Sequence, residues 1–152
     1  MNNAVENNIT HLIMACEFKQ AYELVKSMPC DKLENLLLKI GFDNGQSIVV
    51  YAFVCYLIGQ KNAIDFHFIA QSVLCGPLCY IEGSYNLALY HNKLILDANK
   101  DNIKAMTMML FFSTLPAPLV NEKDAVVFAE KILKADPKNL VAENFLKENM
   151  KQ

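Results

Sequence analysis

The sequence contains no arginine, no tryptophan and only five glycines in 152 residues. All 14 basic side chains are therefore lysines, which nearly balance the 16 acidic side chains at a net charge of −2. Arginine is the usual residue for bidentate contacts to phosphates and bases, so its absence disfavours a nucleic-acid reader. The few glycines form no phosphate-cradling loop. With 53% hydrophobic residues the chain can bury a sizeable core, which excludes a mostly disordered protein.

Long apolar segments are also lacking. The first ten residues are polar and rich in asparagine, unlike a secretory signal, in which an apolar segment follows a basic one. The longest uninterrupted apolar run covers residues 48–58, whereas a membrane-spanning helix needs about 20 residues. We therefore expect a cytoplasmic protein that does not bind or enter a membrane.

The cysteines are odd in number, and most of them lie inside apolar stretches. In a protein without a secretory signal, this pattern is typical of reduced cysteines that act as small buried hydrophobes. We expect this role for Cys16, Cys30, Cys55, Cys75 and Cys79.

Helical signals dominate the chain, and the only β-branched run, residues 48–50, lacks the alternation of a strand. The run 46–58 is apolar nearly all round, which predicts a helix at the centre of the core. The predicted helices are two short ones within 9–28 that meet near residue 16, then 32–40, 46–58, 63–74, 84–98, 101–113, 121–135 and 140–150, with a short helical turn at 78–81.

Capping residues and helix breakers set the expected helix ends. Asp31, Ser84 and Asn121 are expected to cap the helices that follow them, because their short polar side chains can accept hydrogen bonds from free backbone N–H groups. Gly41 and Gly59 are expected to end the helices that precede them.

A self-similarity at a spacing of 37 residues is the most specific feature: residues 88–105 match residues 125–142. In a helix pair, small alanines allow a close approach, and isoleucine and leucine fill the groove between the helices. The identical pairs are Ala88/Ala125, Ile95/Ile132, Leu96/Leu133, Ala98/Ala135, Asn102/Asn139 and Ala105/Ala142.

This pattern resembles the tetratricopeptide repeat (TPR), whose period is about 34 residues. A weaker copy covers residues 17–24, where Cys16 stands in the place of the usual glycine, and Lys100 stands where the other copy has a proline. The matching residues are Gly83, Tyr85 and Ala88 in one copy, and Ala125, Ile132, Pro137 and Asn139 in the other.

The TPR resemblance implies an all-α fold of antiparallel helical hairpins, stacked as a short TPR-like α-solenoid. We expect a single domain over residues 1–152, with irregular helical pairs over 1–60 and TPR-like repeats over 61–150. Such stacks usually hold another protein in a groove.

A longer segment is similar to a particular group of helical proteins. It includes residues 74–85 with Ala88, Tyr90 and His91, then residues 110–112, the break at Leu115 and Pro116, and the repeat at 125–139. Together these resemble the small TPR-like immunity proteins of bacterial polymorphic and contact-dependent growth-inhibition toxin systems, over residues 64–146.

The resemblance implies an immunity protein that binds the C-terminal domain of a cognate toxin, often a nuclease, and blocks its active site sterically. A TPR-type adaptor or secretion chaperone that binds a short peptide is the alternative. The sequence leaves the oligomeric state open.

Catalytic and metal-binding patterns are weak. His11, His67 and His91 have no second ligand at metal-binding spacing, and Cys75 and Cys79 are separated by three residues, unlike a zinc or redox motif. We therefore expect no metal, no cofactor and no enzymatic activity, and a small helical enzyme is the weakest hypothesis. The methionines at 106, 108 and 109 either fill the core or form an adaptable binding face.

Two polar and aromatic mixtures are the candidate partner-binding residues. Asp65 and His67 lie in the first, and Tyr80 and Glu82 in the second. Tyrosine and histidine suit an interface because each has an apolar body and a polar tip, and an acidic neighbour would attract a basic partner. The alternative is that Tyr80 and Tyr85 pack in the core and that Glu82 is a surface or capping residue.

Overall fold

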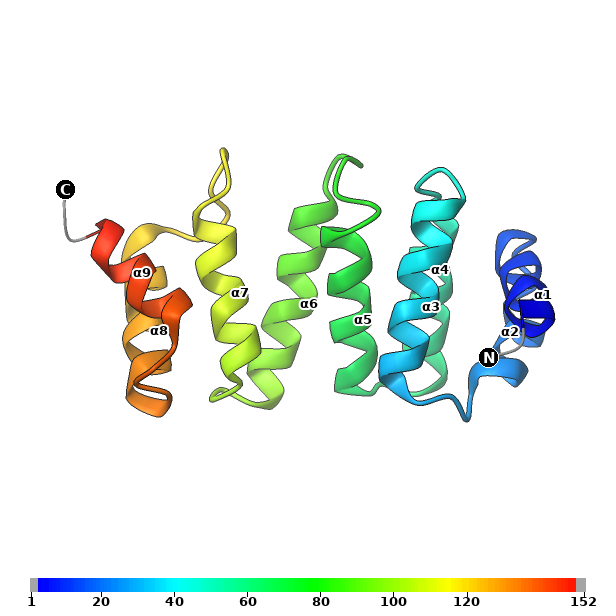
Figure 1. Cartoon of the computed structure of the whole chain (residues 1–152), viewed down its shortest axis with the longest axis horizontal. Coiled ribbons are helices and arrows are strands. Elements are labelled where there is room, and N and C mark those ends of the chain that lie inside the picture. The colour runs from blue at the N-terminus through cyan, green and yellow to red at the C-terminus, as the bar shows by residue number, and fades with distance from the viewer. Residues whose placement is uncertain (1–2, 150–152) are drawn as a thin grey trace. The chain divides into compact units, whose positions relative to one another are not determined.

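The computed structural model describes residues 3–149, and this part of the chain contains nine α-helices and no strand (Figure 1). The predicted all-α class is therefore confirmed. The helices are α1 (Asn3–Met14), α2 (Phe18–Val25), α3 (Cys30–Asp43), α4 (Val49–Gln60), α5 (Ile64–Cys75), α6 (Ser84–Ala98), α7 (Ile103–Ser113), α8 (Glu122–Ala135) and α9 (Leu140–Asn149).

Most expected helices are present within two or three residues of their predicted ends. The first two helices meet around Cys16, and Asn121 caps α8 by accepting a hydrogen bond from the Asp124 N–H at 2.8 Å. The last helix, expected to reach residue 150, is described up to Asn149, and Met150 lies outside the described residues.

Neither predicted glycine stop is correct. Helix α3 continues through Gly41 to Asp43, and α4 continues through Gly59 to Gln60. Pro77 packs so closely against Gly41 that a side chain there has no room: a Cβ at residue 41 would lie 2.7 Å from Cγ of Pro77. Around Gly59 a Cβ would meet nothing within 4 Å, so this glycine is simply tolerated near a helix end.

Two expected caps and one expected helical turn are also wrong. Asp31 lies inside the first turn of α3, after Pro29 at the N-cap. Ser84 lies inside α6, and its hydroxyl donates to the Leu78 carbonyl at 2.7 Å instead of capping the helix. Residues 78–81 form turns rather than helix. Asp101 precedes α7, whose cap is Asn102.

The chain divides into two compact units, Met1–His91 and Asn92–Gln152. In the first unit α4 packs against α1, α2, α3 and α5, and α3 also packs against α5. Helix α4 is thus central, but it is not buried all round as expected, because Ala52 and Cys55 are exposed. Helix α5 is the more enclosed element, with an almost continuously buried run from His67 to Leu74.

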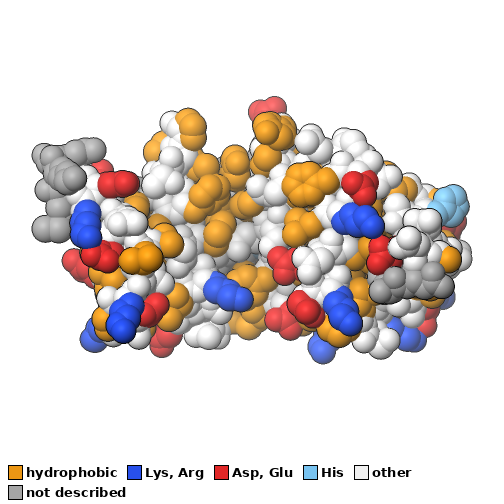
Figure 2. Space-filling model, in the orientation of Figure 1, with side chains coloured by type: hydrophobic (Ala, Val, Ile, Leu, Met, Phe, Trp, Pro, Cys, Tyr) orange, Lys and Arg blue, Asp and Glu red, His pale blue; other side chains and the backbone are white. Residues whose placement is uncertain are grey.

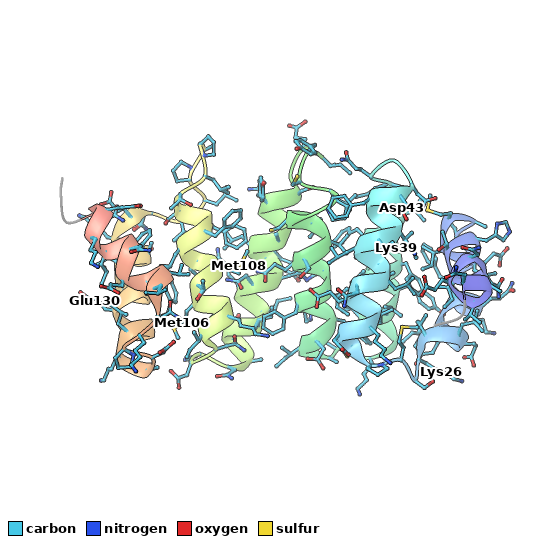
Figure 3. All side chains as sticks on the ribbon, viewed as in Figure 1. Lys26, Lys39, Asp43, Met106, Met108 and Glu130 are labelled. Atoms are coloured by element: carbon cyan, nitrogen blue, oxygen red, sulfur yellow. The ribbon has the colours of Figure 1, made fainter. Side chains whose placement is uncertain are left out.

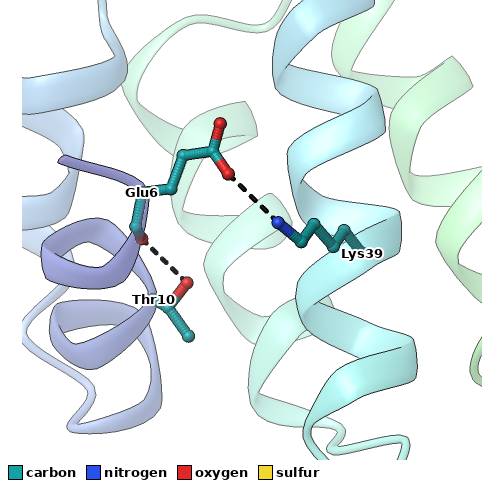
Figure 4. A network of polar contacts seen from close by, with 3 residues as sticks. All are labelled: Glu6, Thr10 and Lys39. Atoms are coloured by element: carbon teal, nitrogen blue, oxygen red, sulfur yellow. Dashed lines mark hydrogen bonds and ion pairs between the residues drawn. The ribbon is translucent and has the colours of Figure 1, made fainter. Parts of the chain in front are cut away.

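Helix α3 is held by polar contacts to two neighbours. Lys39 Nζ lies 3.2 Å from Glu6 Oε2 on α1, and the Thr10 hydroxyl donates to the Glu6 carbonyl at 2.9 Å (Figure 4). On the other side, the Ser72 hydroxyl of α5 donates to Glu34 Oε1 at 2.6 Å. An exposed ion pair contributes up to about 1 kcal/mol, so these contacts mainly fix how α3 is placed.

In the second unit α8 packs against α7 and α9, and α7 also contacts α9. The two copies of the sequence repeat have the same local structure. Ala125 and Ile132 are fully buried, as are Ala88 and Ile95 at the matching positions. Asn139 accepts from the Ala142 N–H at 3.2 Å, as Asn102 accepts from the Ala105 N–H at 3.0 Å.

The methionines of α7 differ in burial. Met106 and Met109 are buried and fill the core of the second unit, whereas Met108 is half-buried. Figure 3 labels Met106 and Met108 on this helix. The longest described helix has 15 residues, and within residues 3–149 no helix combines the length and apolarity needed to span a bilayer.

The expectation of buried cysteines is wrong. All five thiols are free; three are exposed and two are half-buried. The reason is their position: Cys16 and Cys79 lie in connections, Cys30 and Cys75 lie at helix ends, and Cys55 lies on the exposed side of α4. The exposed cysteines are Cys16, Cys30 and Cys55, and the half-buried ones are Cys75 and Cys79.

Candidate functional site

The four candidate residues lie at two places in the first unit. Asp65 and His67 belong to the first turns of α5, whereas Tyr80 and Glu82 belong to the connection that follows its last residue. A helix of 12 residues is about 18 Å long, so the structure does not bring the four side chains into one site.

Asp65 is exposed and lines a cavity of about 310 Å³ beside α2, α3 and α4. The Cys30 thiol donates to Asp65 Oδ2 at 3.7 Å. Burial, and then the negative charge of Asp65, raise the pKa of Cys30, so its thiol stays protonated and is a poor nucleophile. Lys26, labelled in Figure 3, also lines the cavity, and its ammonium group is paired with the Glu23 carboxylate. Cys30, the cysteine that lines this cavity, is therefore not activated as a nucleophile.

His67 is buried and belongs to a hydrogen-bonded network inside the unit. Its Nδ1 lies 2.8 Å from Nδ1 of His91 on α6, and its Nε2 lies 2.9 Å from Oδ1 of Asn62. Nε2 of His91 lies 2.9 Å from the hydroxyl of Tyr51 on α4. Because His67 is 7% exposed and both its ring nitrogens have partners, its role in this structure is internal.

The network is electrically neutral near pH 7. Burial lowers the pKa of His67. Burial, and then the charge of His67, lower the pKa of His91 to about 4. Burial, followed by the hydrogen bond and the charge interaction with Cys55, raises the pKa of Tyr51. All three groups are held in the uncharged form that a buried environment favours.

Sequence reasoning missed the network of Tyr51, Asn62, His67 and His91. Its residues are up to 40 positions apart in the chain, and no motif spacing connects them. The available signal was that His67 and His91 both occur in strongly apolar helical segments, where a buried polar group needs a partner.

Tyr80 is the most exposed large hydrophobic residue described, with 83% of its surface accessible. The connection that carries it is anchored on both sides: Leu78 is fully buried, and the Ser84 hydroxyl donates to the Leu78 carbonyl. Gly83 has a φ of 81°, which suits a glycine in a tight turn. The alternative packing role therefore does not apply to Tyr80; Glu82 is exposed as well.

The end of α3 lies against this connection. A Cβ at Gly76 would be 3.4 Å from Leu38 and 3.9 Å from the ring of Phe42, and Gly41 lies against Pro77. Phe42 is 59% exposed, and Ile48, just before α4, is 48% exposed. Figure 1 shows the α3–α4 connection and the α5–α6 connection at the upper edge of the first unit, and Figure 2 shows hydrophobic side chains gathered there.

We call this surface the aromatic edge and define it by Phe42, Asp43, Ile48, Tyr80 and Glu82. Both acidic side chains are exposed. The segments 41–48 and 76–83 contain no lysine, so the charge of these segments is wholly negative. The aromatic edge thus combines apolar contact area with an acidic character.

Within residues 3–149, no three His, Cys, Asp or Glu side chains are grouped so that they could hold a metal ion. Comparison of the chain with protein-family models, with curated proteins and with solved structures finds no match.

Proposed function

We propose that this chain is a cytoplasmic immunity protein that binds the C-terminal domain of a cognate toxin and blocks its active site by steric occlusion. The observation that carries the proposal is the aromatic edge, on which a highly exposed tyrosine is held by an anchored connection. The toxin as partner rests on the resemblance of residues 64–146 to TPR-like immunity proteins.

The composition of the edge supports a protein partner. Tyrosine is enriched among the residues that dominate binding energy, because it buries a large rigid surface and keeps a polar tip. Leaving Phe42, Ile48 and Tyr80 in water exposes apolar area that a partner would cover.

The charge of the edge supports a basic partner. A nuclease domain presents positive charge to the phosphates of its substrate, and Asp43 and Glu82 would complement that charge. Opposite charges speed encounter and set the orientation of the complex. Inhibition then requires only that the bound chain covers the substrate groove, with no chemical step.

The direct test is co-expression with the C-terminal domain of a large secreted protein encoded beside this gene. We expect the cells to survive and the two chains to co-purify in a one-to-one complex. Cell death despite expression of this chain would refute the toxin proposal. Micromolar binding of a short peptide without neutralisation would identify an adaptor instead.

Replacing Tyr80 tests the surface itself. Tyr80→Ala should weaken the complex by about 2 kcal/mol, or roughly 30-fold, as expected for a central anchor. Tyr90→Ala is the matched control, because Tyr90 is also exposed, at 57%, but lies within α6. Isothermal titration calorimetry measures both; equal losses for the two variants would argue against the aromatic edge.

A further inference from the structure

Four side chains form one continuous line of hydrogen bonds across α4, the α4–α5 connection, α5 and α6: Tyr51, His91, His67 and Asn62. The direction of each bond follows from Asn62, whose Oδ1 can only accept. His67 must therefore carry its hydrogen on Nε2, which leaves Nδ1 as an acceptor. His91 then donates from Nδ1, and its Nε2 accepts from the Tyr51 hydroxyl.

This line can hold one additional proton without losing a bond. If His67 becomes protonated, its Nδ1 donates to Nδ1 of His91, and His91 donates from Nε2 to the Tyr51 oxygen. A second proton cannot be accommodated, because both Nδ1 atoms would then carry hydrogen. These atoms are 2.8 Å apart, and the two rings would both be positive in a buried place.

We propose that Tyr51, His91, His67 and Asn62 are a proton-controlled latch that fastens α4 and α5 to the part of α6 that carries His91, while the two imidazoles share at most one extra proton. A second proton opens the latch. This inference is independent of the proposed toxin partner, because it concerns the free chain.

The groups around the pair do not offset the added charge. Tyr51 contacts the pair from α4 and itself interacts with Cys55. Asn62 contacts it from the α4–α5 connection, and the ring of Tyr90 lies 5.4 Å from that of His91. Within residues 3–149 no carboxylate forms an ion pair with either imidazole. Burial is the main cause of both lowered pKa values, and the only charge that contributes is that of the neighbouring histidine.

The sign of the pH effect follows from these directions. Histidine in the unfolded chain takes up a proton near pH 6.5, whereas the folded pair resists protonation, with the pKa of His91 at about 4. The unfolded state therefore binds more protons below pH 6.5. The stability that the neutral histidine pair contributes is fully present above that pH and is lost as the pH falls towards 4. The folding constant falls by up to about tenfold per pH unit for each proton that only the unfolded state binds.

The first test is the tautomer of each ring in the intact protein at pH 7.5, read from two-bond ¹H–¹⁵N correlations of the imidazoles. We expect His91 with its hydrogen on Nδ1 and His67 with its hydrogen on Nε2. An Nε2–H tautomer for His91, or the same tautomer for both rings, would overturn the proposal. This measurement needs no variant and so does not depend on a variant folding.

The second test is urea unfolding between pH 7.5 and 4.5. The wild-type chain should lose stability as the pH falls, because the unfolded state binds more protons than the folded histidine pair does, and His91→Gln should reduce this difference in proton binding. His11→Gln is the control, because His11 is exposed and outside the latch. This variant should leave the part of the pH dependence of unfolding that His67 and His91 contribute unchanged. A wild-type stability that is independent of pH over this range would refute the latch.

Discussion

Cys16 lies in the connection between the end of α1 at Met14 and the start of α2 at Phe18. Its φ is 60°, in the left-handed region that favours glycine. The Cys16 N–H donates to the Ile13 carbonyl at 2.9 Å, and the Glu17 N–H donates to the Leu12 carbonyl at 2.8 Å. This pair of bonds is a Schellman motif, whose left-handed position is usually glycine. The left-handed backbone at Cys16 therefore lowers the stability of the folded chain, and a glycine at this position would remove that strain.

Cys16→Gly should raise the free energy of unfolding by about 0.5 to 1 kcal/mol, because relief of the strained backbone outweighs the greater freedom of the unfolded chain. Cys55→Gly should have the opposite effect, since Cys55 is exposed within α4, where glycine disfavours the helix. Urea unfolding compares the two variants. A loss of stability for Cys16→Gly would contradict the role assigned to this position.

Gly41 and Gly59 are both helical glycines, but their surroundings differ. Gly41→Ala should lower the free energy of unfolding by about 1 to 3 kcal/mol, because the new methyl group would press on Pro77. Gly59→Ala should raise it by about 0.5 to 1 kcal/mol, because the methyl group meets open space and favours the helix. Thermal unfolding followed by circular dichroism would show whether the two signs differ.

At the scale of the helices, Asn102 and Asn139 perform the same task at matching positions of the repeat. Each accepts a hydrogen bond from the backbone N–H three residues later. Asn102→Ala and Asn139→Ala should each cost about 1 kcal/mol of stability. Asn86→Ala is the control, because Asn86 is exposed inside α6, where alanine is the better helix former. A cost at Asn86 similar to that of the caps would argue against capping.

The helices could be predicted from the sequence because apolar spacing and caps such as Asn121 are local signals. The errors lie where a distant residue decides. Gly41 lies within α3 rather than at its end, and the reason for a glycine there is that Pro77 packs against it and leaves no room for a Cβ. Ser84 does not cap α6, because its hydroxyl is used by the Leu78 carbonyl.

The candidate site was predictable only in part, for the same reason. Tyr80 and Glu82 lie in a connection, and their exposure agrees with a turn rich in glycine and proline. The inward position of His67 depends on its partner His91, 24 residues later, and no local pattern indicates that pairing. Burial of a single histidine is set by the packing of helices, which sequence spacing alone does not fix.

For the whole molecule, the net charge of −2 is too small for strong long-range attraction, so the position of each charge matters more than the total. Glu82→Lys should slow association with a basic partner and make the rate less dependent on salt, because it places a positive charge at the aromatic edge. Stopped-flow association at two ionic strengths measures this effect.

Glu130→Lys provides the matched control for Glu82→Lys. It changes the net charge by the same amount, but Glu130 is an exposed residue of α8 in the second unit (Figure 3). Its effect on the association rate should be much smaller. If both variants slow binding equally, overall charge rather than the aromatic edge controls the encounter.

The three solvent-open thiols have a practical consequence for anyone handling the purified chain. Cys16 and Cys55 stand open to water, whereas the raised pKa of Cys30 keeps its sulfur in the sluggish protonated form. A maleimide dye will therefore couple to Cys16 and Cys55 before Cys30. In air the same sulfurs will join neighbouring molecules covalently, so preparations need a reducing agent until they are labelled.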